Sequence, residues 1–142
     1  MRLLALLLFL APAAHAQLAI GGQVGDPTGL AFKSGQGPGA VVAGLGFNLG
    51  ADRVSLDAHY VLGQGRVSGA RGLRTLYGPG AFFRSSGNGD DSNVQAGLSA
   101  VLGVEVGLAD RLDAFLHGLP RLQLTDGTDV DLDAALGLRF VL

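Results

Sequence analysis

The chain has 142 residues, a formal net charge of −2 and no cysteine. This excludes a disulfide-stapled domain and a cysteine metal site, and it gives no indication of nucleic-acid binding. Charged residues make up 15% of the chain, against about 25% in an ordinary soluble domain, and 24 residues are glycine. Few charges and much glycine indicate a protein whose outside does not face water and whose interior is narrow.

The first 16 residues have the layout of a secretory signal peptide. Arg2 precedes an apolar run that ends at Leu10, and the small tripeptide Ala14-His15-Ala16 follows. We predict cleavage before Gln17, which leaves residues 17–142 as a single domain. The apolar run is too short to favour a membrane anchor helix, and no later stretch is long enough to span as a helix. The mature domain would therefore meet a membrane with strands or at its surface.

Period-two alternation of apolar residues predicts β-strands along the whole mature chain. In the clearest run, residues 94–108, every even position is apolar, whereas the odd positions hold mainly glycine and polar residues. A helix would instead need apolar residues at three- and four-residue steps. Turn-forming residues separate the strands, and the longest predicted connection is Gly63–Gly72. The eight predicted strands are 18–25, 28–34, 41–49, 54–62, 74–84, 94–108, 112–124 and 130–142.

Eight strands of this length predict a closed barrel, and the face chemistry predicts its surroundings. Strands of about ten residues cross a bilayer when tilted. Alternation also suits a soluble lipocalin-like barrel, which points its apolar face inward. The more polar face holds mostly glycine, alanine and serine with scattered charges, which is too sparse for a solvated surface. We therefore predict an all-β fold, an eight-stranded antiparallel up-and-down transmembrane β-barrel of the outer membrane, in contact with lipid as a monomer.

On this interpretation the polar face becomes a lumen that side chains fill. It holds four cationic residues against five carboxylates, and buried charges must pair. The near balance favours a blocked interior over an open pore. The predicted lumen network consists of Lys33, Asp57, His59, Arg84, Glu105, Asp113, His117, Arg121, Asp131, Asp133 and Arg139.

Two features could carry chemistry, and for both we favour a structural role. Asp129, Asp131 and Asp133 alternate along one strand face, but their spacing lacks the order of a calcium loop, so we favour an Asx turn that leads into lumen carboxylates. His59 and His117 could serve a hydrolase, yet no nucleophile motif lies beside them. We therefore expect no catalytic residue, metal or cofactor.

Basic and proline residues raise two further questions. Arg66, Arg71 and Arg74 follow Gly63, and we favour a solvated connection over a contact with lipid headgroups. Pro79 and Pro120 fall inside strand patterns. Because proline has no N–H to donate to a strand ladder, each should lie at a bulge or a strand end.

Four segments resemble a family of small bacterial outer-membrane β-barrels of uncharacterised function, BAPKO_0422-like and of the OmpX/OmpA eight-stranded type. They are GDPTGLAFK (25–33), DAHYVL (57–62), LYGPGAFFR (76–84) and LDAFLHGLPRLQLTDGTDVDLDAALGLRF (112–140). The resemblance implies an eight-stranded barrel and no established activity. Such strands often end on an aromatic residue that the barrel-assembly machinery reads, but here Phe140 is followed by Val141 and Leu142.

The function expected from these observations is a structural or interaction role for a closed outer-membrane barrel that is not an enzyme. Three alternatives stay open. The barrel could pass small or apolar molecules across the outer membrane, it could be a soluble periplasmic lipocalin-like binding barrel, or it could act on lipids.

Overall fold

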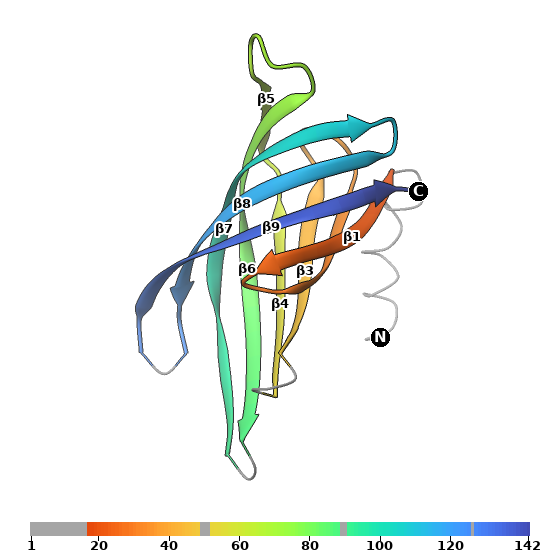
Figure 1. The fold of residues 1–142 in the computed structure, drawn as a ribbon. Helices are drawn as coiled ribbons and strands as arrows, with labels where there is room; N and C mark the ends of the chain where they lie inside the picture. Colours follow the sequence, from red (N-terminus) through yellow and green to blue (C-terminus); the bar gives the residue numbers. More distant parts are fainter. Residues whose placement is uncertain (1–16, 49–51, 89–90, 126) are drawn as a thin grey trace, which may run out of the picture.

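The computed structural model describes residues 17–48, 52–88, 91–125 and 127–142. The predicted signal peptide, residues 1–16, lies outside the described residues. The described part of the chain contains no helix that is long and apolar enough to cross a membrane. Its strands are β1 (Leu18–Gly25), β2 (Gly29–Ser34), β3 (Val41–Asn48), β4 (Arg53–Tyr60), β5 (Gly63–Arg66), β6 (Leu73–Asn88), β7 (Asp91–Ala109), β8 (Leu112–Gln123) and β9 (Asp129–Val141) (Figure 1).

The strands form one antiparallel sheet that closes on itself. Hydrogen-bonded neighbours run in the order β4-β3-β2-β1-β9-β8-β7-β6-β5, and β4 also pairs with β6. Both β4 and β5 pair with β6, so they are successive halves of one strand of the barrel. The fold is therefore a closed antiparallel barrel of eight strands, which confirms the predicted topology. Every strand of the barrel therefore has two neighbours, although β7 before Gly97 and β9 before Ala135 have ladder pairs on one side only.

A bulge separates β4 from β5 and explains the position of Pro79. His59 of β4 pairs with Gly80, whereas Gly63 of β5 pairs with Tyr77. Three residues of one strand, 60–62, thus face two of the other, 78–79, which is a β-bulge. Pro79 lies opposite this irregularity, as its missing N–H predicts. The interpretation of residues 63–72 as a connection was wrong for its first four residues, because after the bulge they continue pairing as β5.

Pro120 interrupts a ladder without a bulge. The β7–β8 register pairs Ser99 with Arg121 and then Leu102 with Gly118, and no pairs lie between them. On the other side, Pro120 pairs with Leu132 of β9. The expectation of a bulge or strand end was therefore wrong here. Proline lacks one donor, so one ladder loses a hydrogen bond while its register continues.

The barrel has two unlike ends. At one end, which we call the terminal mouth, Gly35 donates to the Gln17 carbonyl and Leu142 donates to the Leu18 carbonyl. The opposite end, the distal mouth, carries the hairpin of β6 and β7, which reaches Asn88 and Asp91 (Figure 1). The predicted strands 74–84 and 94–108 were therefore too short at this end. The wall is low along β1, β2 and β3 and tall along β6 and β7, which have 16 and 19 residues.

The two faces of the wall differ sharply in chemistry. Among strand positions whose side chains are described, every Asp, Glu, Lys and Arg lies on the face that points into the barrel. The outward positions hold apolar residues, glycine, proline and a few hydroxyl residues. Many of the large apolar ones are more than two-fifths exposed: Leu30, Phe47, Leu56, Tyr77, Leu98, Leu102, Leu116, Leu136 and Leu138.

Candidate functional site

In all eight strands every second side chain points into the barrel, and these inward positions bring polar side chains together in the lumen. Of the eleven residues predicted for the lumen network, ten are buried or half-buried and take part in ion pairs or hydrogen bonds. The exception is Asp131, which is exposed near the distal mouth, where β9 extends beyond the end of β1. The ten form two clusters.

The first cluster surrounds Glu105 of β7, and we call it the Glu105 cluster. The Lys33 ammonium donates to Glu105 Oε2 at 2.6 Å, and Arg139 Nη2 donates to Glu105 Oε1 at 2.5 Å. Two further groups lie near the same carboxylate, His117 Nε2 at 3.7 Å and Arg74 Nη2 at 3.9 Å. The Glu105 side chain is fully buried. Burial without these cations would be very costly for a carboxylate, so the cluster holds five strands, β2, β6, β7, β8 and β9, together around one charge.

Arg139 extends this cluster toward β8. Its Nη2 atom also donates to Asp113 Oδ2 at 2.9 Å. The guanidinium lies over the Phe115 ring at 4.3 Å from the centroid, and that ring in turn contacts the His117 ring at 4.5 Å between centroids. A cation over an aromatic face is attracted by the ring quadrupole, so the aromatic layer stabilises the buried charge.

The second cluster lies toward the distal mouth, and we call it the Asp133 cluster. Arg84 and Arg121 both donate to Asp133 Oδ2, at 2.9 and 2.5 Å. Arg121 Nη2 also donates to Asp57 Oδ2 at 3.3 Å, and Arg84 Nη2 lies 2.8 Å from Asp26 Oδ2. Both guanidiniums lie within 6 Å of the centroid of the Phe82 ring. Two cations here face three carboxylates, whereas three cations face two carboxylates around Glu105.

Three residues that contact the predicted network were not predicted to belong to it. They are Asp26 and Arg74, described above, and Ser99, which lies 2.8 Å from His59. Asp26 stands in a turn, Arg74 stood in a predicted solvated segment, and Ser99 is one of several small residues on its strand face. Arg74 is part of β6, which agrees with the predicted strand 74–84 and not with the solvated connection that was favoured for the same residue. No periodic signal marks a turn residue as facing the lumen. For Arg74 the inward parity with Arg84 on the same strand was an available signal.

His59 joins Ser99 and Asp57 in an arrangement that resembles a hydrolase triad. His59 Nε2 and Ser99 Oγ are 2.8 Å apart, with the hydrogen-bond direction set by the tautomer. The His59 Nδ1 atom lies 3.7 Å from Asp57 Oδ1, beyond hydrogen-bonding distance. All three residues are buried in the packed lumen. Within the packed lumen the observed contact of this trio is the hydrogen bond between His59 and Ser99.

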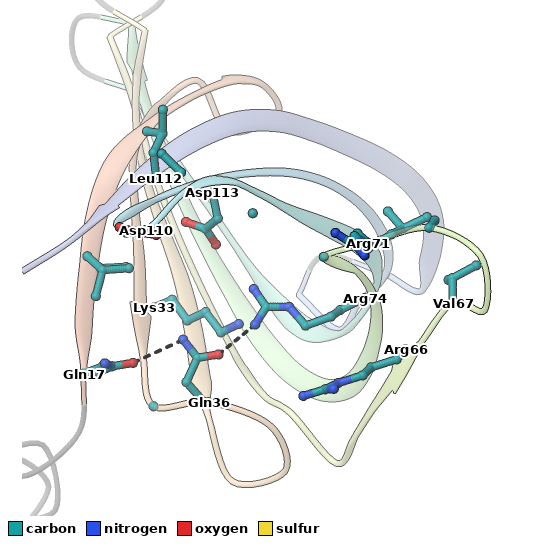
Figure 2. Close-up of a pocket in the computed structure, with 18 residues that line it drawn as sticks. Gln17, Lys33, Gln36, Arg66, Val67, Arg71, Arg74, Asp110, Leu112 and Asp113 are labelled. Carbon is teal, nitrogen blue, oxygen red and sulfur yellow. Dashed lines mark hydrogen bonds between the residues drawn. The ribbon is translucent and has the colours of Figure 1, made fainter.

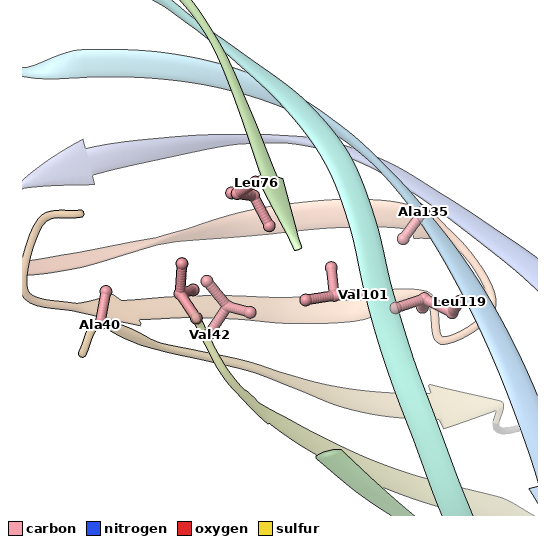
Figure 3. Close-up of a cluster of buried hydrophobic side chains, with 7 residues drawn as sticks. Ala40, Val42, Leu76, Val101, Leu119 and Ala135 are labelled. Atoms are coloured by element: carbon pink, nitrogen blue, oxygen red, sulfur yellow. The ribbon is translucent and has the colours of Figure 1, made fainter. Parts of the chain in front are cut away.

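Apolar packing closes the middle of the lumen. Val101 is fully buried and packs with Leu76, Leu119 and other small apolar residues from several strands (Figure 3). A cavity beside this cluster, lined partly by His59, His117 and Arg139, measures about 10 Å³. This is about the space of one water molecule. The described lumen is therefore filled and has no continuous channel of ligand size.

Two larger open cavities lie at the two mouths of the barrel. The terminal mouth has a cavity of about 580 Å³, lined by residues that include Lys33, Arg66 and Asp113 (Figure 2). The distal mouth has one of about 510 Å³, lined by residues that include Asp26 and Arg53. Both are of the size that small ligands occupy.

The carboxylates that follow the last turn are arranged for pairing and turn formation. Asp129 Oδ1 accepts a hydrogen bond from the Val130 N–H, while Asp133 binds two guanidiniums. Within the described ranges, no three His, Asp or Glu side chains converge in a way that could hold a metal ion. Asp126 and Asp90 lie outside the described residues.

Fold and lumen together define the class of this protein as a closed antiparallel eight-stranded barrel with an ion-paired interior. No protein-family model, curated protein or solved structure matches the chain. The proposal below therefore depends on the residues and their geometry alone.

Proposed function

We propose that this protein is a bacterial outer-membrane barrel with a side-chain-filled lumen and a structural or interaction role. The observation that supports this most strongly is the absence of charge from the outward face of the strands, among positions whose side chains are described. An outward Arg or Lys near the bilayer midplane costs about 2–4 kcal/mol, whereas a water-facing strand normally carries such residues. The distribution of charge is therefore the one that lipid favours.

The exposed apolar area supports the same surroundings. Large apolar side chains such as Leu98, Leu102 and Leu116 stand outward on neighbouring strands, and each is about half exposed. Soluble monomers rarely expose contiguous apolar patches of more than a few hundred Å². Closure also pairs most of the backbone of the sheet internally, as a membrane-spanning segment requires. In this proposal the barrel is a monomer that the barrel-assembly machinery inserts, and its family resemblance stays a prediction.

The packed interior favours this role over the alternatives. A lipocalin-like binding barrel needs an internal pocket, typically of about 300–1,000 Å³, and the interior cavity here is about 10 Å³. A passage for small molecules needs a continuous lumen, which the Glu105 cluster, the Asp133 cluster and the apolar packing between them block. The same packing favours a protein that is not an enzyme, because it leaves His59 and Ser99 out of reach of a substrate.

Fractionation with heat-modifiable gel migration tests the membrane proposal. We expect the protein in the outer-membrane fraction, extracted only by detergent. Unheated samples should migrate differently from boiled ones, because a closed barrel resists unfolding by detergent. Recovery as a freely soluble periplasmic protein would overturn the proposal.

Single-channel recording in a planar bilayer tests the blocked lumen. We expect no discrete conductance steps from the purified barrel, because paired charges and apolar side chains fill the interior. An open porin recorded in the same bilayer is the positive control. Regular steps of uniform size would contradict the blocked lumen and favour the passage alternative.

A further inference from the structure

The cavity at the terminal mouth is asymmetric in charge. Arg66, Arg71 and Arg74 line it on the side of β5, β6 and the turn between them, while Asp110 and Asp113 lie on the side of β7 and β8 (Figure 2). Asp113 is already engaged by Arg139 at 2.9 Å. The negative charge on this side is therefore partly neutralised, whereas on the arginine side only Arg74 lies near a carboxylate, that of Glu105.

Two of these arginines make no contact that would account for their position. Among the described residues, no ion pair or side-chain hydrogen bond involves Arg66 or Arg71, and both residues are exposed. Arg74 does have partners, since its Nη1 donates to Gln36 Oε1 at 3.1 Å and its Nη2 lies near Glu105. Arg74 is thus held in place by the lumen, whereas Arg66 and Arg71 present their guanidiniums to the cavity.

Each wall of this cavity holds one buried polar atom without a partner. Arg74 Nε is a donor without an acceptor, and Asp113 Oδ1 is an acceptor without a donor. Both atoms are enclosed, so the donors that remain open to the cavity are the guanidiniums of the exposed Arg66 and Arg71. Guanidinium donors without protein acceptors suit a ligand that carries several oxygen acceptors.

The excess of positive charge at this end comes from the arginines themselves. In the Glu105 cluster, whose Lys33 and Asp113 line the cavity floor, Lys33 and Arg139 balance Glu105 and Asp113, and the remaining cation is the cavity arginine Arg74. The Asp133 cluster near the distal mouth has instead one more carboxylate than it has cations. The terminal mouth therefore favours an anion more than the distal mouth does.

We propose that the cavity at the terminal mouth binds a phosphate-bearing anion through the guanidiniums of Arg66, Arg71 and Arg74. Guanidinium groups bind phosphate oxygens in a bidentate fork, and three of them match a group with more than one negative charge. The phosphate belongs to either a lipid headgroup or a soluble molecule, and the cavity of about 580 Å³ has room for each. The proposal goes beyond the membrane role, and binding of a soluble phosphate does not depend on that role.

The test compares two double variants that remove the same charge. R66Q/R71Q removes the two cavity arginines that make no other contact, so the barrel should fold normally. R53Q/R111Q is the matched control, because Arg53 lies at the distal mouth and the exposed Arg111 lies in the β7–β8 turn outside the cavity. Pyrophosphate binding is measured by calorimetry in zwitterionic detergent micelles. Retention of phosphatidylglycerol over phosphatidylcholine is measured by native mass spectrometry.

We expect R66Q/R71Q to weaken binding by at least about tenfold, because it removes at least one charge-assisted hydrogen bond to the anion. We expect R53Q/R111Q to leave binding unchanged. Pyrophosphate binding would identify a soluble ligand. Selective retention of phosphatidylglycerol without pyrophosphate binding would identify a headgroup. Absence of both in the wild-type protein, or equal binding by the two double variants, would overturn the site. Neither of these results bears on fractionation, so failure here and failure of the membrane role are distinguishable.

Discussion

Replacing Glu105 with glutamine is expected to lower the free energy of unfolding by about 3–5 kcal/mol, the range for breaking a buried ion pair. Glutamine keeps the shape of the side chain but removes its charge. Lys33 and Arg139 would then be buried beside a neutral amide, and each has its closest carboxylate contact at Glu105. The measurement is reversible unfolding by urea in detergent micelles. It is followed by far-UV circular dichroism, because the chain has no tryptophan for fluorescence.

The matched control for this prediction is Asp110→Asn, which removes one carboxylate charge from an exposed turn at the same end of the barrel. It should change stability by less than about 0.5 kcal/mol, as surface substitutions usually do. In a double-mutant cycle, adding Lys33→Gln to Glu105→Gln should cost less than adding it to the wild type. Equal stability of Glu105→Gln and wild type would show that the cluster does not stabilise the fold.

Replacing Leu102 with arginine is expected to destabilise the barrel by about 2–4 kcal/mol in a lipid bilayer. Leu102 points outward and is 59% exposed. It lies near the middle of the part of β7 that pairs on both sides, residues 97–109. In lipid this position lies close to the midplane, where an arginine has no water to solvate it. The measurement is urea-induced unfolding from phospholipid vesicles.

Leu108→Arg is the control for the same strand and the same face. Leu108 is 56% exposed, but it lies near the terminal mouth beside the β7–β8 turn. An arginine there should cost only about 0–1 kcal/mol, because its side chain reaches the interface. If lipid surrounds the barrel, the free-energy cost of an outward arginine should be large in the middle of β7 and small near its end. Equal small costs at both positions would mean that water surrounds the barrel.

The strands were predictable because alternation is a local property. Each run of alternating apolar residues, such as 94–108, identifies its own inward and outward face without knowledge of its neighbours. The same parity predicted that Lys33, Glu105 and Arg139 share the interior. The one predicted network member that lies exposed, Asp131, has the right parity but stands where β9 extends past the end of β1. The position of a residue in the two-residue period gives the direction of its side chain. Whether that side chain is buried depends on how far the neighbouring strands extend.

Three features of the fold escaped the pattern for identifiable reasons. The segment Gly63–Arg66 has glycine at alternate positions, so its strand carries no apolar signal and forms because β6 offers a partner. The bulge before it depends on the stagger that closes the barrel. Asp26 belongs to a turn, and its contact with Arg84 exists because the turn lies over the mouth.

By itself, the sequence determined the strands, their number and which side chains face inward, because these follow from a two-residue period along a chain. Only the tertiary structure decided which charges meet. Lys33 and Glu105 are 72 positions apart, and Arg121 and Asp57 are 64 apart. Such partners depend on the stagger between strands and on the curvature of the closed sheet, and neither is encoded in any single strand.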